Sequence, residues 1–250
     1  MDLFNKRIIN EYIEKNIYAI SDKGLLHLEI IERIKNFLKQ DADRTKEKSI
    51  QTLFLQRVFE EILGYLSQLS GEKKYNLLIE PTTDFDATEP DGALGFFDTN
   101  LKKVRAVIEL KPSNIDLDKK QLNRKDNKSP VEQAFSYSYK FDGCKWVIVS
   151  NFKEIRLYNT ERGINFYQKF NVLDLHDENE FRKFYFIFNK DNLLSLTGES
   201  LIEKLAKETN LKEENITKEF YSKYKETRNR LYKQLTEDNS QTDKNLIFIM

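Results

Sequence analysis

The spacing of apolar residues along the chain distinguishes helical segments from strands. Apolar residues recur at three- and four-residue intervals within residues 24–40 and again within residues 49–69. Each of these segments is therefore predicted to form an amphipathic helix with one apolar face. Gly64 is expected to end the second helix or to allow another backbone to approach it closely.

Short runs rich in β-branched and aromatic residues follow, and they have the length and composition of strands. Between them, residues 129–141 ("SPVEQAFSYSYKF") begin with Ser129, Pro130 and Glu132, a helix start close to a capping box. The resulting order of helix, three strands, helix and two strands predicts an α/β fold, in which helices cover a central mixed sheet. The predicted strands lie within residues 75–85, 92–98, 104–110, 145–151 and 154–159.

The C-terminal part of the chain has a different character. Residues 178–190, 199–209 and 213–235 all show helical spacing, and we expect a boundary near residue 192 between the α/β domain and a helical extension. Residues 223–233 ("KYKETRNRLYK") are basic and contain two tyrosines. We interpret this helix as one side of an interdomain contact.

Composition narrows the class of protein without identifying a partner. The chain has 250 residues, with 41 Lys and Arg against 41 Asp and Glu, so any positive patch must be local. A single cysteine allows no internal disulfide, and this suits a reducing cytoplasm. No signal peptide is evident, and no apolar run reaches the roughly 18 residues of a membrane span, so we expect a cytoplasmic protein with no membrane partner.

Several common kinds of site have no support in the sequence. His27 and His176 are far apart and have no nearby His or Cys, so a zinc site of about four ligands cannot be assembled from them. Cys144 precedes a strand and is expected to pack in the sheet rather than attack a substrate. No GxxxxGK[ST] segment occurs, so no phosphate-binding loop of that type is expected.

Residues 88–112 ("TEPDGALGFFDTNLKKVRAVIELKP") carry the chemistry that the sequence offers. If "IELK" is the end of a strand, Glu109 and Lys111 point to one face and Leu110 to the other. Asp91 can join them from a neighbouring loop or strand, and two close carboxylates then require a cation. Mg²⁺ prefers such oxygen ligands, and a lysine beside it can orient or deprotonate a water for attack on a phosphodiester. The alternative is an exposed strand end with an ordinary Glu–Lys pair.

The combination "PDG…IELK" resembles the PD-(D/E)xK nuclease superfamily, with Asp91, Glu109 and Lys111 at the motif positions. Gln133 and Tyr137 add the spacing QxxxY, which is similar to the additional motif of type I restriction nucleases. The resemblance implies that these two side chains share one helix face, look onto the catalytic centre, and help to hold DNA or the metal shell. The superfamily often places a glutamate on the first core helix, and the candidates are Glu47, Glu60 and Glu61.

The segments "FLQRVFEEILGY" and "VIVSNFKEIRLYN" look like the N-terminal region of type IIG restriction enzymes, in which nuclease, methyltransferase and target recognition share one polypeptide. The resemblance implies that the absent methyltransferase part, and not this chain, binds S-adenosylmethionine, since no "NPPY"-like tetrapeptide is present. The final "KNLIFIM" is either a short terminal strand or helical turn, or the place where a longer polypeptide is cut. The expected domains are an N-terminal helical segment (1–44), an endonuclease core (45–192) and a helical connector from a larger protein (193–250).

The resemblance therefore implies a Mg²⁺-dependent DNA endonuclease that accepts Mn²⁺ as a substitute and leaves 5′-phosphate and 3′-hydroxyl ends. Asp91, Glu109 and the Leu110 carbonyl would hold the metal, and Lys111 would position or activate the water. Double-stranded DNA is the expected partner, and a transient dimer would explain cleavage of both strands. The alternatives are a repair or recombination nuclease of the same fold and a catalytically silent DNA-binding scaffold.

A lysine-rich loop lies between Lys111 and the helix of Gln133. It is close enough in sequence to reach a DNA backbone beside the cleavage centre, but a solvated loop is an equally good interpretation. The candidate DNA-binding residues of this loop are Lys119, Lys120, Arg124 and Lys125.

Overall fold

The structure is a computed structural model of the 250-residue chain. It describes residues 1–15, 28, 29, 32, 36, 47–83, 85–121 and 126–238, and for residues 47–50 it describes the backbone alone. The helix predicted over residues 24–40 therefore lies almost entirely outside the described residues. The same holds for His27, Arg124 and Lys125.

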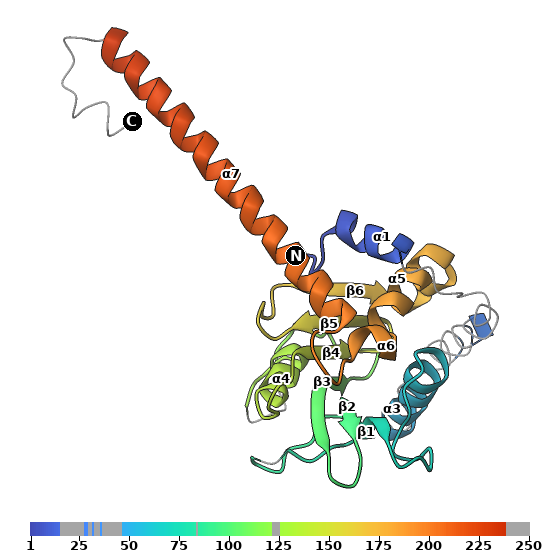
Figure 1. Cartoon of the computed structure of the whole chain (residues 1–250). Helices are drawn as coiled ribbons and strands as arrows, with labels where there is room; N and C mark the ends of the chain where they lie inside the picture. The colour runs from blue at the N-terminus through green and yellow to red at the C-terminus, as the bar shows by residue number, and fades with distance from the viewer. Residues whose placement is uncertain are drawn as a thin grey trace. The chain divides into compact units, whose positions relative to one another are not determined.

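A six-stranded mixed sheet forms the centre of the fold, with its strands in the sequential order β1 to β6 (Figure 1). β3 and β4 are parallel, and every other neighbouring pair is antiparallel. The predicted α/β class with a central mixed sheet is confirmed. The strands are β1 (Tyr75–Ile79), β2 (Gly92–Phe97), β3 (Lys102–Leu110), β4 (Trp146–Ser150), β5 (Glu154–Asn159) and β6 (Tyr167–Asn171).

Helix α4 (Pro130–Ser138) covers one face of the sheet, because the parallel strands β3 and β4 need a crossover connection. Its start is the capping box that the sequence predicts: Ser129 Oγ accepts from Glu132 N at 3.2 Å, and Glu132 Oε2 accepts from Ser129 N at 2.8 Å. Apolar residues of α4 pack on this face against buried residues that include Val107 and Val149.

The opposite face carries the larger core and most of the remaining helices (Figure 1). The predicted helix over residues 49–69 is α3 (Glu47–Phe54), continued by the wider π-helix η3 (Leu55–Ile62). It ends before Gly64, whose φ of 80° few other residues adopt. Before α3 the chain forms α1 (Lys6–Lys15), and after β6 it forms the 3-10 helix η4 (Val172–His176), α5 (Glu178–Phe188) and α6 (Lys190–Leu193).

The helix predicted over residues 49–69 ends early, at Ile62, and two further elements differ from the sequence prediction. The strand β6 was not predicted, because along Tyr167–Asn171 only Phe170 is buried and the apolar signal is weak. The two helices predicted at 199–209 and 213–235 are one helix, α7 (Leu201–Asp238). That segment contains no glycine or proline, so nothing in it stops a helix.

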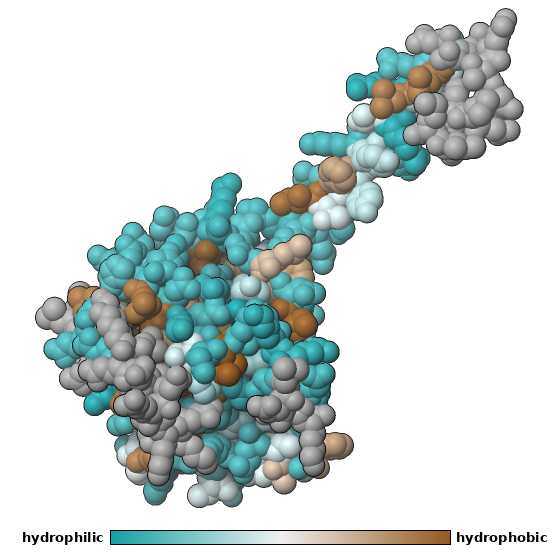
Figure 2. Space-filling model, turned by 180° about the vertical axis from the view of Figure 1, so that it is seen from behind, coloured by the Kyte–Doolittle hydropathy of each residue, from teal (hydrophilic) through white to brown (hydrophobic). Residues whose placement is uncertain are grey.

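The chain divides into two compact units, Met1–Ala206 and Lys207–Met250. The first contains the whole sheet and both core clusters. On the face shown in Figure 2, hydrophilic residues dominate its surface and apolar residues are scattered among them. Every helix within the described residues is too short or too polar to cross a lipid bilayer.

Candidate active site

The sheet brings the three motif residues to one edge, formed by the N-terminal end of β2 and the C-terminal end of β3. Gly92 of β2 lies opposite Ile108 of β3, so Asp91, just before β2, lies at the end of the sheet where Glu109 and Leu110 complete β3. The Asp91 carboxylate is bound there, because its Oδ2 accepts a hydrogen bond from Leu110 N at 2.6 Å. This hydrogen bond from a backbone N–H to a side chain links two residues that are 19 positions apart in the sequence.

Glu109 lies on the face of the sheet that α4 covers. Side chains alternate along a strand, so Glu109 shares the face of Val107, and in β4 it lies opposite Val149, which packs under α4. The Glu109 side chain is 2% exposed and forms an ion pair with Lys111, with 2.6 Å between Oε1 and Nζ. A buried carboxylate needs such a partner because it has lost its hydration. Lys111 is fixed as well, since its backbone N–H donates to Ser150 O at 2.8 Å.

Gln51 of α3 completes this edge, and the sequence did not identify it. Its Nε2 donates to Asp91 Oδ1 at 3.2 Å and to Leu110 O at 3.3 Å. One amide therefore aligns a carboxylate and a backbone carbonyl. The available signal was weak: a polar residue one helical turn beyond Glu47 and next to the apolar face that packs on the sheet.

The oxygen atoms of this edge match the preference of a hard divalent cation. Asp91, Glu109 and the Leu110 carbonyl offer two carboxylates and one carbonyl, which Mg²⁺ can accept while it keeps several waters. Within the described ranges no group of three or more His, Cys, Asp or Glu side chains is gathered anywhere, so softer multi-histidine or thiolate sites are absent from that part of the chain. The geometry suits an oxygen-bound metal with few protein ligands.

Gln133 and Tyr137 lie together in α4, as the QxxxY spacing predicts. Gln133 Nε2 donates to Tyr137 Oη at 3.0 Å, and Gln133 Oε1 accepts from Gln121 Nε2 at 3.3 Å. Both side chains are buried, with exposures of 4% and 8%. The Gln133 amide therefore uses these contacts to tie α4 to the loop that leaves Lys111, and a role in holding DNA or the metal shell stays a prediction.

The loop after Lys111 is anchored to the sheet through a buried arginine. Arg156 of β5 lies in register with Val149 and so faces the same side as Glu109. Its Nη1 donates to both Asp118 carboxylate oxygens, at 2.9 and 3.0 Å, and its Nη2 donates to Glu154 Oε1 at 2.7 Å. Burial disfavours the charge of Arg156, but the hydrogen bonds to Asp118 and Glu154 raise its pKa above the usual range. The arginine is thus a permanent cation that fixes the start of the loop.

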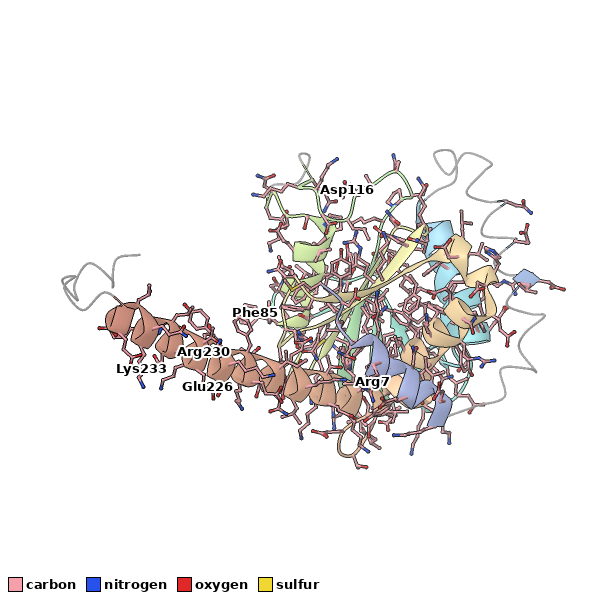
Figure 3. The ribbon with its side chains drawn as sticks, turned by 90° about the horizontal axis from the view of Figure 1, so that it is seen from above. Arg7, Phe85, Asp116, Glu226, Arg230 and Lys233 are labelled. Atoms are coloured by element: carbon pink, nitrogen blue, oxygen red, sulfur yellow. The ribbon has the colours of Figure 1, made fainter. Side chains whose placement is uncertain are left out.

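The candidate DNA-binding residues fall on this loop. Lys119 and Lys120 are exposed, and Lys119 Nζ lies 3.3 Å from Asp116, which is labelled in Figure 3. Gln121 N donates to Lys128 O at 3.1 Å, and Arg124 and Lys125 lie outside the described residues. Contact of these lysines with DNA stays a prediction.

The other residues that the sequence singled out do not join the site in the described part of the chain. Glu61 forms an ion pair with Arg57 on η3, and the Glu47 side chain is outside the description. Burial raises the pKa of the Cys144 thiol to about 12, which makes it a poor nucleophile. His176 is exposed and its Nδ1 lies 2.6 Å from Leu173 O.

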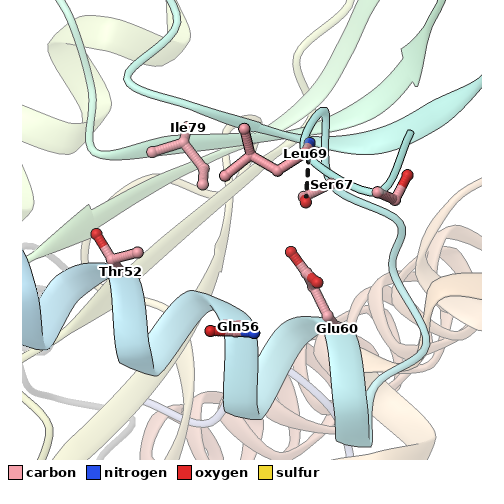
Figure 4. A pocket seen from close by; sticks show the side chains of 7 residues that line it. Thr52, Gln56, Glu60, Ser67, Leu69 and Ile79 are labelled. Carbon is pink, nitrogen blue, oxygen red and sulfur yellow. Dashed lines mark hydrogen bonds between the residues drawn. The ribbon is translucent and has the colours of Figure 1, made fainter. Parts of the chain in front are cut away.

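A separate cavity of about 170 Å³ lies between the helix α3–η3 and β1 (Figure 4). Glu60 contributes a carboxylate to it, and none of the lining residues is cationic, so it does not fit a phosphate. The lining residues are Thr52, Gln56, Glu60, Ser67, Leu69, Ser70 and Ile79.

Comparison with known proteins places the chain in a family. No curated protein sequence matches it. Among solved structures it is similar to a chain of "cryoEM structure DrdV-DNA complex", with a TM-score of 0.41, 15% sequence identity and coverage of 66% of this chain. The match spans 14% of that chain. Residues 28–196 match the family described as "MmeI, N-terminal domain", so the chain belongs to the MmeI N-terminal domain family, which confirms the resemblance to the N-terminal region of type IIG restriction enzymes.

Proposed function

We propose that this chain is the Mg²⁺-dependent endonuclease domain of a type IIG restriction–modification enzyme, and that it hydrolyses phosphodiester bonds of double-stranded DNA. The observation that supports this is the convergence at Leu110. The Asp91 carboxylate is bound to the Leu110 N–H, the Leu110 carbonyl is held by Gln51, and Glu109 and Lys111 form an ion pair on either side of that residue. Membership of the MmeI N-terminal domain family supports the same proposal.

Each residue of the site has a defined task in this proposal. Asp91, Glu109 and the Leu110 carbonyl would hold Mg²⁺, which supplies positive charge at the scissile phosphate and activates a water for in-line attack. Gln51 keeps the Asp91 carboxylate and the Leu110 carbonyl aligned. Lys111 remains beside Glu109 at 2.6 Å, where its ammonium orients the water and stabilises the negative charge that develops on the phosphate.

The remaining functions of such an enzyme are assigned to other parts of a longer polypeptide. We propose that methyltransferase and target-recognition domains lie on the same full-length chain, and that S-adenosylmethionine binds there. One active site cuts one strand at a time, so we also propose that two copies meet transiently on DNA. We propose that water attacks the phosphorus and that the bond to the 3′ oxygen breaks, which gives products with 5′-phosphate and 3′-hydroxyl ends.

The test is cleavage of plasmid DNA by the full-length protein in Mg²⁺ or Mn²⁺, comparing wild type with Asp91→Ala and Lys111→Ala. We expect each variant to lose at least about 10²-fold in rate, because each loses charge stabilisation at the reacting phosphate. Lys190→Ala is the matched control: it removes an ammonium that lies 3.5 Å from Asp191 on α6. Cutting at the wild-type rate by both site variants would refute the proposal.

A further inference from the structure

The C-terminal half of α7 carries a face made of basic residues and tyrosines. Its members follow one another at intervals of three, four, three and four residues, so in a helix they lie within an arc of about 80° and extend over about 21 Å. All five are exposed, Tyr221 by 66% and Tyr232 by 36%. We call this the basic-tyrosine face, and it consists of Lys218, Tyr221, Lys225, Arg228 and Tyr232.

The acidic residues of the same stretch of α7 lie elsewhere on the helix. At 100° per residue, Glu219, Glu226 and Glu237 fall on the flank of the helix opposite the basic-tyrosine face. Glu226 and the basic Arg230, which falls on the same flank, are labelled in Figure 3. Between residues 218 and 232 the basic-tyrosine face therefore contains three cationic side chains and no carboxylate. Lys218 approaches Glu214, one turn earlier, at 3.9 Å, in a pair whose side chains are both more than half exposed. Such an exposed pair is weak and does not neutralise the face.

An apolar stripe lies on a different side of the same helix. Ile216, Phe220, Tyr224, Leu231 and Leu235 centre about 100° away from the basic-tyrosine face. The interdomain contact expected of residues 223–233 stays a prediction, and this stripe of exposed apolar side chains is the surface of α7 that a protein neighbour would cover. A neighbour on the stripe leaves the basic-tyrosine face accessible to a second partner.

We propose that the basic-tyrosine face binds the sugar–phosphate backbone of duplex DNA. Lysine and arginine supply charge for phosphate oxygens, and tyrosine hydroxyls donate hydrogen bonds to them. Along about 21 Å of the duplex axis each strand has roughly six phosphates, with about 3.4 Å of axial rise between them, so a helix that lies against one strand has several phosphates within reach of these side chains. A row of cations with no interspersed carboxylate is complementary to this continuous row of anions. The proposal extends the DNA contacts of the proposed nuclease to a second surface and rests on that function only for the choice of partner.

The experiment compares two double variants that remove the same charge. Lys225→Ala/Arg228→Ala alters the basic-tyrosine face, and Lys223→Ala/Arg230→Ala alters the opposite flank of the same helix. Binding of the 250-residue chain to a fluorescein-labelled duplex of arbitrary sequence is followed by anisotropy between about 50 and about 200 mM NaCl, with a chelator present so that no cleavage occurs. Alanine favours helix, and far-UV circular dichroism checks that the helix content is retained.

We expect the face variant to bind more weakly and the slope of log K against log salt to fall by about 1.8, because two phosphate contacts are lost. The flank variant should keep the wild-type slope. Equal changes in the two variants would show a dependence on net charge alone, and an unchanged face variant would show that this surface serves another partner, such as an acidic protein. Either result overturns the proposal. Because cleavage is not measured, the outcome is independent of the proposed nuclease activity. The face variant can bind DNA more weakly than the flank variant even if the nuclease is inactive, and the two can bind alike even if it is active.

Discussion

Replacing Gln51 by leucine tests whether its amide aligns the oxygens of the proposed metal site. The change keeps the approximate volume of the side chain and removes both hydrogen bonds, the one to Asp91 Oδ1 at 3.2 Å and the one to Leu110 O at 3.3 Å. The Asp91 carboxylate remains bound to Leu110 N at 2.6 Å, so this end of the sheet should stay folded while Asp91 Oδ1 loses the hydrogen bond from Gln51 that aligns it.

The expected effect follows from the strength of these bonds. A hydrogen bond to a charged group contributes about 1.5–3 kcal/mol, and about 1.4 kcal/mol corresponds to tenfold in an equilibrium constant. Gln51→Leu should therefore weaken Mg²⁺ binding by roughly 10- to 100-fold, which is the range found when a group that orients a metal ligand is removed.

The assay is the rate of plasmid cleavage as a function of Mg²⁺ concentration, with the full-length protein. We expect the half-saturating Mg²⁺ concentration to rise by this factor while the rate at saturating Mg²⁺ changes less. Gln56→Leu is the matched control, because Gln56 is exposed on the continuation of the same helix and lines the cavity beside β1. A Gln51→Leu variant with the wild-type Mg²⁺ response, or a Gln56→Leu variant with the same loss, would refute the reasoning.

Three further predictions concern stability and reactivity. Arg156→Ala should lower the free energy of unfolding by about 1.5–3 kcal/mol in urea titrations, because it removes the ion pair with the partly buried Glu154, which keeps Lys169 as a second partner. Asp118→Ala, whose side chain is 62% exposed, should cost at most about 1 kcal/mol, and equal losses in the two variants would contradict this. The hydrogen bond from Lys140 holds the pKa of Asp86 below its usual range, so this pair stabilises the fold above the ordinary aspartate pKa of about 3.9, and its contribution is lost as the pH falls through the lower pKa of the folded state. Lys140→Met should remove that part of the acid dependence, and an unchanged acid titration of stability would argue against the pair. The Cys144 thiol, which is half-buried and has its pKa raised to about 12, should react with a disulfide reagent near pH 8 much more slowly in the folded chain than after denaturation, and equal labelling rates would contradict the raised pKa.

Much of the fold was predictable from local patterns. Five of the strands, the helix α4 with its capping box, and the helix that begins at α3 all follow from residues that are close in the sequence. Hydrophobic periodicity and capping depend on residues within one or two helical turns, so the local sequence is sufficient to predict these elements. The same holds for the placement of Asp91 and Glu109 at strand ends.

The partners of the site residues were decided by the tertiary structure. Gln51 reaches residues 40 and 59 positions away in the sequence, and Arg156 reaches Asp118 across 38 positions. Likewise, β6 is placed by its pairing with β5, since its own apolar signal is weak. Hydrogen bonds of this kind depend on where packing places whole helices and strands, and no local pattern encodes that distance. The sequence alone thus predicted which residues would bear the proposed chemistry, and the packing of α3 and β5 against the sheet determined which side chains contact them.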